Sequence, residues 1–502
     1  MPETPRQEED SARIGMIWKN AGWLGAVPIL LNFVALFSTG YITRRVGPEH
    51  FGRFSIALSY TTLALLITDL GLRALSVRDL SRGGAGARHR LHDLVSLRLL
   101  LAVAAVLIAW GIAAILRIAA GDVELSSVLL VSSLGIIPTS LTGTMTDGLI
   151  ARDQARATTK ATFWSGVLLT IASVIAVAIW PNEVALAASY LIGPMINYTM
   201  LARRSRAIYG PIRLRWRPRQ WRVLVHRAAP FYRINIVGVA LGRIETPLIG
   251  ALFGAAMAGY YAAAVSLADR LGAVIDSVTT AALPTLMRLG GNASRVTDVL
   301  ARILHPLLGA LLAGCIMATM GATAAVTVVF GAQYAPGGPA LAIALFLLPV
   351  SAVNALVFEG FVAIRRVDFV AGTILRGQLV TGALLPLLVL SLGLPGAPLA
   401  KLIGQLFVAL ARVGASRVAF EGLWGPRYLR PLFWRTLGAV PVPIILWLGD
   451  FRPLVAVAVS GGWFLCWVAA TAHSSGVLQL LRPAQSGRGA VGGELPPYIP
   501  SA

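Results

Sequence analysis

Long apolar segments separated by short polar breaks run along most of this chain. Most of them are close to the roughly 20 residues that an α-helix needs to cross the hydrocarbon core of a bilayer. Fourteen such spans are predicted, at roughly 20–41, 54–77, 97–117, 125–150, 161–180, 183–202, 229–253, 258–285, 300–329, 339–363, 369–392, 396–418, 434–449 and 453–480. The pattern predicts an all-α polytopic membrane protein with about 14 transmembrane helices.

The composition agrees with this prediction. Hydrophobic residues make up 56% of the chain and charged residues 13%, a more apolar balance than that of soluble domains. The first apolar run is long enough to remain as a helix, so we expect no cleaved signal peptide. Cys315 and Cys466 lie in apolar spans without pair or metal spacing, and we expect them to be small core residues.

The charge of the chain is strongly positive and unevenly placed. The formal net charge is +21, and 31 of the 43 Lys and Arg residues lie in every second gap between spans, beginning with the N-terminal tail. This asymmetry is the positive-inside rule, so both termini are expected in the cytoplasm. A basic surface also suits nucleic acid, but orientation in the membrane accounts for the placement, and we expect no nucleic-acid partner. The basic gaps also suit anionic lipid headgroups.

A short motif occurs twice in the chain, 207 positions apart. The first copy, residues 47–54, reads Gly-Pro-Glu-His-Phe-Gly-Arg-Phe, and the second begins at residue 254. Without a gap, the copies align matching residues: Gly47 with Gly254, Gly52 with Gly259, and Asp69 with Asp276. Two related halves in a membrane chain predict a transporter with a substrate path between its lobes. The four glycines are expected to serve tight turns and close helix packing.

Several stretches resemble one transporter family. They are Tyr-Ile-Thr-Arg-Arg-Val-Gly-Pro-Glu-His-Phe-Gly-Arg-Phe at 41–54, Thr-Asp-Leu-Gly-Leu at 68–72, Gly-Arg-Ile-Glu-Thr-Pro-Leu-Ile-Gly at 242–250, Ala-Gly-Tyr-Tyr-Ala-Ala-Ala at 258–264, Leu-Pro at 283–284, and Phe-Gly-Ala-Gln-Tyr-Ala-Pro at 330–336. In these the chain is similar to the Wzx-type oligosaccharide flippases of the multidrug/oligosaccharidyl-lipid/polysaccharide (MOP) exporter superfamily, which also contains the MATE transporters. Glu245 departs from the Asp expected in the family pattern.

The resemblance implies an architecture of two pseudo-symmetric six-helix lobes around a central cavity. The expected division is a cytoplasmic tail at 1–15, an N-lobe at 16–205, a basic cytoplasmic linker at 206–228, a C-lobe at 229–420, two further helices at 421–482 and a disordered cytoplasmic tail at 483–502.

The resemblance also implies a function. We expect alternating-access export of a polyprenyl pyrophosphate-linked oligosaccharide across the bacterial inner membrane, for a surface polysaccharide such as O-antigen, exopolysaccharide or capsule. Expected partners are the bilayer, this glycan lipid and a polysaccharide polymerase or ligase. We expect a monomer without a cofactor, coupled to H⁺ or Na⁺ if to an ion at all.

Charged residues within the spans are the candidate functional residues, because each costs roughly 2.5–3.5 kcal/mol on insertion scales. At about 100° per residue, Arg233 and Arg243 of the seventh span lie within roughly 80° of each other and could track a pyrophosphate. Asn235 could flank that face, whereas Glu245 points about 160° from Arg243. Arg270, about half-way through the eighth span, is the preferred phosphate contact, and Arg243 is the second.

Four acids are candidates for binding a coupling ion: Asp269, Glu245, Asp276 and Asp69. An intramembrane carboxylate could take up a proton or bind Na⁺.

Structural roles for these residues stay open. Asp69 and Asp276, near cytoplasmic helix ends, could neutralise loop arginines. Arg233 could snorkel to the interface, and Asn235 could bond a neighbouring helix. Arg243, Asp269 and Arg270 could form buried structural pairs.

An enzyme is the main alternative from another class, and the sequence speaks against it. The outer gaps are short and hold no His/carboxylate or Ser/His set, and no Gly-rich phosphate loop with its lysine occurs. A membrane polysaccharide polymerase or ligase is therefore disfavoured.

Two other carriers remain open, a MATE-like drug or cation antiporter and a peptidoglycan lipid-precursor flippase. Seven basic against six acidic residues within the spans slightly favour an anionic headgroup.

Overall fold

The computed structural model describes residues 32, 34–81, 86–227, 240, 242–289, 292–364, 366–426 and 429–430. Within these residues the chain is helical without strands, and nine helices are long and apolar enough to cross a membrane. The predicted all-α membrane class is therefore confirmed. The predicted spans at 434–449 and 453–480 and both terminal tails lie outside the described residues, so the total of fourteen spans stays a prediction.

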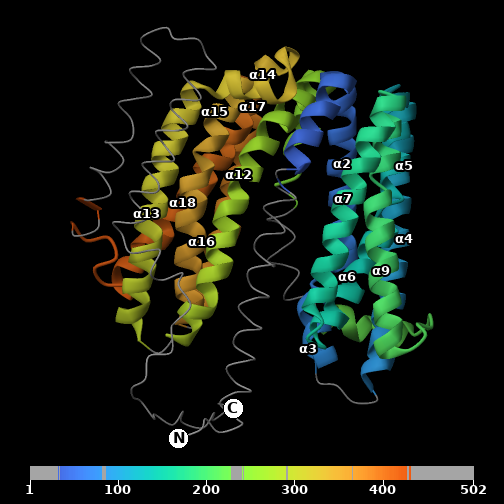
Figure 1. Cartoon of the computed structure of the whole chain (residues 1–502), viewed down its shortest axis with the longest axis horizontal. Helices are drawn as coiled ribbons and strands as arrows, with labels where there is room; N and C mark the ends of the chain where they lie inside the picture. The colour runs from blue at the N-terminus through green and yellow to red at the C-terminus, as the bar shows by residue number, and fades with distance from the viewer. Residues whose placement is uncertain are drawn as a thin grey trace, which may run out of the picture.

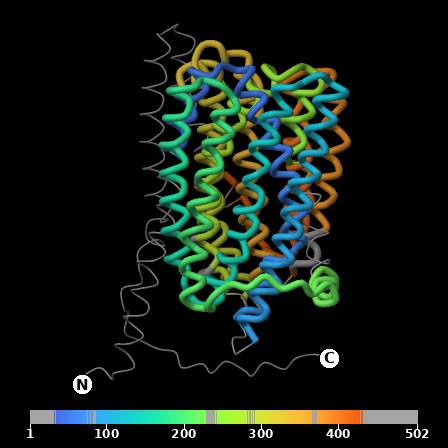
Figure 2. Tube along the Cα trace, turned by 90° about the vertical axis from the view of Figure 1, so that its right-hand side faces the viewer, coloured from blue at the N-terminus to red at the C-terminus, as the bar shows by residue number. Residues whose placement is uncertain are grey.

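The first lobe contains the helices drawn in blue to green on the right of Figure 1. After a helical stretch at 34–46 come α2 (Pro48–Asp69), α3 (Leu72–Ser81), α4 (Gly86–Ala119), α5 (Val123–Ser133), α6 (Ile136–Ile150), α7 (Ala155–Ile179), α8 (Glu183–Ser189) and α9 (Ile192–Tyr209). Most of these helices stand upright side by side, and the segment that follows α9 crosses their lower end (Figure 2). That segment, residues 210–227, carries six arginines, and we call this end of the molecule the basic end.

The second lobe lies on the left of Figure 1 in yellow-green to orange. It contains α11 (Glu245–Phe253), α12 (Ala255–Arg288), α13 (Ala293–Met320), α14 (Ala322–Phe330), the 3₁₀ helix η1 (Ala332–Gly337), α15 (Gly338–Leu345), α16 (Leu347–Ala363), α17 (Val367–Leu392) and α18 (Gly396–Ala419). α12 packs along α2 of the first lobe, and the ribbons of the two lobes diverge from this contact toward the basic end (Figure 1).

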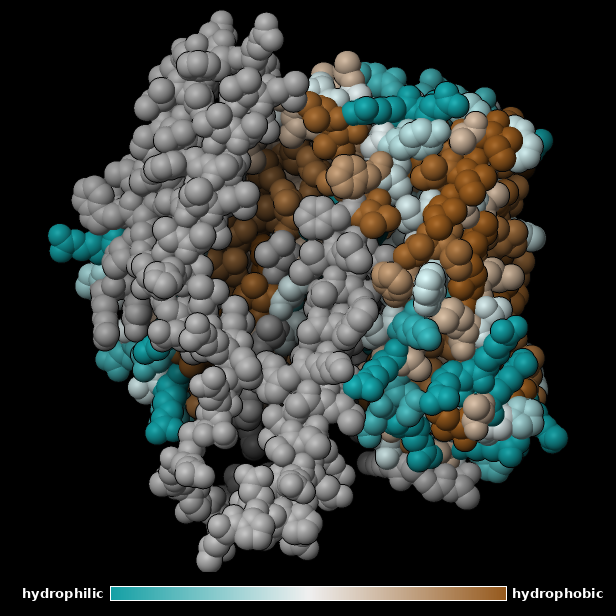
Figure 3. All heavy atoms as spheres, viewed as in Figure 1, coloured by the Kyte–Doolittle hydropathy of each residue, from teal (hydrophilic) through white to brown (hydrophobic). Residues whose placement is uncertain are grey.

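Side chains on the outside of the lobes are those expected of a lipid-facing surface. Leu107, Ile115 and Ile118 of α4 and Ile171 and Ile175 of α7 are exposed. On the first lobe, Figure 3 shows an apolar brown band between hydrophilic teal ends. An apolar belt of this kind favours burial in hydrocarbon over contact with water.

Several predicted spans are divided between two helices in the structure, and two of these breaks affect candidate site residues. The second span breaks after Asp69, where Leu70 and Gly71 adopt φ of 40° and 73°, left-handed values that end a helix. The predicted continuous seventh span is wrong at 242–244, where the chain turns before α11 begins at Glu245. Because of this turn, angles counted along one helix do not relate Arg243 to Glu245.

The lobes meet where the two copies of the repeat cross. A Cβ added to Gly52 would collide with the carbonyl oxygen of Ala255, and one added to Gly259 would collide with the carbonyl oxygen of Pro48. Ala255 lies 207 positions after Pro48, as Gly259 does after Gly52. The contact is therefore reciprocal, each copy offering a glycine to the backbone of the other, and it requires residues without a side chain.

The glycines that precede this crossing occupy equivalent turns. Gly47 has φ 84° and ψ 168°, and Gly254 has φ 89° and ψ 169°. These are conformations that glycine adopts without the steric cost of a Cβ. The predicted roles of all four glycines, in turns and in close packing, are confirmed.

A second set of contacts joins the lobes at the end opposite the basic end. The Thr43 hydroxyl donates to the Phe330 carbonyl at 3.4 Å, while Gln333 Nε2 and the Tyr334 hydroxyl donate to the Thr43 carbonyl at 3.3 and 3.4 Å. Tyr334 is fully buried. These bonds and the glycine crossing hold the lobes together at this end.

Gly52→Ala or Gly259→Ala is expected to destabilise the protein by about 1–3 kcal/mol, because the new methyl group meets backbone rather than a movable side chain. The measurement is the thermal unfolding midpoint of the purified protein in detergent. Gly111→Ala is the matched control, since a Cβ there meets nothing within 4 Å and replaces a helical glycine. Equal midpoints for Gly52→Ala and Gly111→Ala would contradict the role of the crossing.

Candidate functional site

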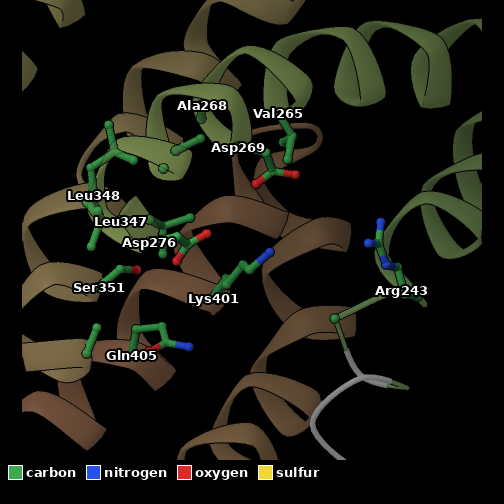
Figure 4. Close-up of a pocket in the computed structure, with 15 residues that line it drawn as sticks. Arg243, Val265, Ala268, Asp269, Asp276, Leu347, Leu348, Ser351, Lys401 and Gln405 are labelled. Atoms are coloured by element: carbon green, nitrogen blue, oxygen red, sulfur yellow. The ribbon is translucent and has the colours of Figure 1, made fainter. Parts of the chain in front are cut away.

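A cavity of about 470 Å³ lies within the second lobe, between α12, α15, α16 and α18 and the turn that precedes α11 (Figure 4). Its volume is in the range of small-molecule sites. Its lining residues are Gly242, Arg243, Val265, Ala268, Asp269, Gly272, Ile275, Asp276, Ala344, Leu347, Leu348, Ser351, Ala355, Lys401 and Gln405.

One face of α12 forms a wall of the cavity. The lining residues at 265, 268, 269, 272, 275 and 276 follow the three- and four-residue spacing that places side chains on one side of a helix. The small residues Ala268 and Gly272 leave room in the middle of this face. Asp269 lies between these two and Asp276 one turn after Gly272. The acids are seven residues apart, so two turns of one helix present both carboxylates to the same space.

Four charged side chains line the cavity: Arg243, Asp269, Asp276 and Lys401. In Figure 4, the carboxylates of α12 and the Lys401 ammonium from α18 point toward the same open space, and Arg243 lies across from them. Within the described residues, Arg243, Asp269 and Asp276 make no ion pair of their own. All three are exposed and line the cavity, so this arrangement suits a polar, charged ligand.

Glu245 lies behind this cavity and does not line it. Its side chain is 4% exposed and accepts a hydrogen bond from the Tyr261 hydroxyl of α12. Lys401 Nζ lies 3.8 Å from the other carboxylate oxygen, Oε1, which has no hydrogen bond. Lys401 therefore connects the cavity to a buried acid. Lys401 was not among the predicted site residues, although a cation within the apolar span at 396–418 was a signal that could have identified it.

Arg270 points away from the cavity and toward the first lobe. Its Nη2 donates to the Thr39 hydroxyl at 2.9 Å and its Nη1 to the Asn32 carbonyl at 3.2 Å. Because consecutive residues on a helix differ by about 100°, Asp269 faces the cavity while its neighbour Arg270 faces the other lobe. In this conformation Arg270 bonds the lobes together and does not share a site with Arg243.

Asp69 belongs to a separate cluster in the first lobe. Arg98 of α4 is buried, and its Nη2 lies 2.9 Å from Asp69 Oδ1 and 3.4 Å from Asp147 Oδ2. Arg73 Nε approaches the other oxygen of Asp147 at 3.9 Å. Asp69 thus neutralises an arginine, as one alternative proposed. α4 begins at Gly86 and carries Arg98 into the core.

The structure therefore brings together only part of the predicted set. Arg243, Asp269 and Asp276 share the cavity with Glu245 behind it, whereas Arg270 and Asp69 lie elsewhere. Arg233 and Asn235 lie outside the described residues. No group of three or more His, Cys, Asp or Glu side chains in the described part is arranged to hold a metal ion.

A family comparison identifies the chain. The sequence model of the family described as "Polysaccharide biosynthesis protein" matches residues 41–338, more than half of the chain, and the chain belongs to this family. The match confirms the resemblance on which the family prediction was based. No curated protein sequence matches the chain.

Solved structures share the fold at low sequence identity. One, described as lipid II flippase MurJ in an inward closed conformation, is 13% identical with a TM-score of 0.72, over 91% of this chain and 99% of that one. An inward-facing multidrug resistance MATE family transporter of the MOP superfamily is 14% identical with a TM-score of 0.62, over 80% and 98%. A MOP superfamily transporter from Pyrococcus furiosus is 16% identical with a TM-score of 0.54, over 80% and 95%. Each of these solved structures is described as a flippase or a transporter, and the chain shares their fold.

Arg98→Leu is expected to destabilise the protein by about 3–5 kcal/mol, because it leaves the buried carboxylate of Asp147 with only the exposed Arg73, 3.9 Å away, as a counter-charge. Thermal unfolding in detergent measures this. Arg117→Leu, on the exposed end of the same helix, is the matched control and should change the midpoint little. The double variant Arg98→Leu/Asp147→Leu should recover part of the loss, since it removes both charges. A double variant less stable than Arg98→Leu alone would contradict the pairing.

Proposed function

We propose that this member of the polysaccharide biosynthesis protein family moves a lipid pyrophosphate-linked oligosaccharide from the cytoplasmic to the outer leaflet of the bacterial inner membrane, by alternating access. The observation that carries the proposal is the charged cavity of the second lobe. Arg243 and Lys401 line it, and Arg243 has no ion-pair partner within the described residues.

The chemistry of the lining suits a glycan headgroup. The guanidinium of Arg243 offers paired donors for phosphate oxygens, and Lys401 adds a mobile point charge. Asp269, Asp276, Ser351 and Gln405 offer acceptors and donors for sugar hydroxyls. Apart from Ser351, the lining residues of α15 and α16 are apolar. A headgroup with adjoining phosphates and sugars would use both kinds of contact, whereas a cationic drug could bind Asp269 and Asp276 but would be repelled by Arg243 and Lys401.

The contacts between the lobes support entry of the headgroup from the basic end. The glycine crossing and the Thr43 bonds join the lobes at the opposite end. With the basic end in the cytoplasm, as the positive-inside rule predicts, the headgroup enters between the lobes while the lipid tail stays in the bilayer. Rocking of the lobes would break the bonds of Arg270 to Thr39 and Asn32, which frees Arg270 for the phosphates in the course of the cycle.

A peptidoglycan-precursor flippase is the second candidate. The observation that favours it is the likeness to a structure described as a lipid II flippase, which extends over 91% of this chain. Its substrate would present the same class of pyrophosphate headgroup to Arg243. The two candidates differ in which surface polymer fails when the protein is absent.

Further properties of the transporter are proposed with this function. Asp269 and Asp276 are candidates for binding H⁺ or Na⁺ in a coupled cycle. The protein works as a monomer, with both termini in the cytoplasm, and delivers its product to a polysaccharide polymerase or ligase.

Deletion of the gene is expected to abolish surface polysaccharide and to accumulate the lipid-linked precursor inside the cell. Arg243→Ala should restore no more than about a tenth of the polysaccharide, because a charge-assisted contact contributes about 1.5–3 kcal/mol. Polysaccharide on the cell surface and extracted lipid-linked glycan are the two measurements. Arg417→Ala, exposed at the end of α18 and outside the cavity lining, is the matched control and should restore wild-type levels.

The outcomes separate the candidates. Unchanged polysaccharide with loss of viability and accumulation of peptidoglycan precursor would favour the second candidate. Unchanged polysaccharide with altered drug sensitivity would overturn both and assign the chain to drug export.

A further inference from the structure

Lys401 lies between a buried carboxylate, that of Glu245, and the open cavity. Its side chain is 29% exposed and lines the cavity, yet its ammonium lies 3.8 Å from the buried Glu245 Oε1. Within the described residues Glu245 is its one ion-pair partner, since Asp269 and Asp276 stay beyond ion-pair distance although they line the same space. The flexible four-carbon stem of a lysine lets its ammonium move from one partner to the other.

Few groups would stabilise the negative charge of Glu245 if the Lys401 ammonium moved away. The Tyr261 hydroxyl bonds one oxygen, while the other is buried without a hydrogen bond. Neither α2 nor α17, which also pack against α11, contributes a charged group bonded to Glu245 within the described residues. The further charges nearby are Arg243, in the turn two residues before Glu245, and Asp269 on α12. A buried carboxylate that loses its counter-charge is stabilised by taking up a proton.

We propose that Lys401 is a headgroup-binding residue released by protonation of Glu245, so that an anionic headgroup and a proton bind together. In the empty cavity Lys401 neutralises Glu245. When the pyrophosphate enters, the ammonium moves to a phosphate oxygen and one proton moves from solvent to the Glu245 carboxylate, where Tyr261 keeps its contact with the other oxygen. The Lys401 ammonium then neutralises a phosphate charge, and the proton neutralises the Glu245 carboxylate. Because linkage is reciprocal, the headgroup favours the proton as much as the proton favours the headgroup. The inference rests on the proposed function.

Binding of a short-chain prenyl pyrophosphoryl sugar to the purified full-length protein tests this exchange. The two phosphates of this diester keep their charges between about pH 5 and pH 8, so the probe itself does not titrate in that range. Wild-type affinity should increase as the pH falls, by up to about tenfold per unit where one proton is taken up. Calorimetry in buffers of different ionisation enthalpy should show proton uptake on binding, and that measurement needs no variant.

The variants distinguish Glu245 from the other acids of the cavity. Glu245→Gln, which mimics the protonated acid, should bind at high pH as tightly as wild type does at low pH, with no pH dependence. Lys401→Gln should bind weakly and also lose the pH dependence. Arg243→Gln is the matched control, because it removes a cation of the cavity outside the exchange and should weaken binding while keeping the slope. Asp276→Asn should also keep the slope.

The outcomes are separable from those of the proposed function. A wild-type affinity that does not change with pH, or a slope that survives Glu245→Gln and disappears in Asp269→Asn or Asp276→Asn, overturns the exchange and leaves the flippase proposal standing. Absence of any binding of the probe to wild type overturns the proposed function and the exchange with it.

Discussion

The close approach of two backbones at Gly52 and Gly259 is the constraint on which the arrangement of the lobes depends. Each glycine lies against a carbonyl oxygen of the opposite helix, and neither position has space for a Cβ. In a membrane, helices gain little from burying apolar surface against one another, so close van der Waals contact between small residues supplies much of their association. The crossing brings α2 and α12 together, and α12 in turn carries the wall of the cavity and the inter-lobe contact of Arg270.

The charged residues of the two lobes differ in whether other side chains neutralise them. In the first lobe, Arg98 lies between Asp69 and Asp147 and is buried, so its charge is compensated by side chains of the same lobe. In the second lobe, Arg243 and Asp269 face a cavity without ion-pair partners in the described residues. A compensated cluster stabilises a fold, whereas uncompensated charges at a cavity lower the cost of bringing in a charged ligand. This asymmetry between two related lobes supports the proposal that the headgroup binds in the second lobe.

Residues adjacent in sequence have separate roles because α12 serves two surfaces. Asp269 faces the cavity and Arg270 faces the first lobe, since one step along a helix turns a side chain by about 100°. Arg270 was predicted to contact phosphate together with Arg243 because it lies about half-way through the eighth span, but its side chain bonds Thr39 and Asn32 of the first lobe. Depth follows from counting residues, but the direction of each side chain depends on which helices pack on either side. The relative directions of Arg243 and Glu245 could not be predicted either, because the chain turns at 242–244 and helical angles do not extend through a break.

The sequence by itself determined the membrane class, the position of most helical segments in the described part though not their breaks, the internal repeat and its glycines, and the family. These follow from local properties: apolar length matches the bilayer, and positive φ or close packing needs glycine. Only the tertiary structure decided that Lys401 meets Glu245, that Arg98 is buried between two acids, and that Arg270 bonds the other lobe. Each of these contacts joins residues from different helices, and their distances depend on how the helices pack, which the hydrophobic pattern of a single span does not encode.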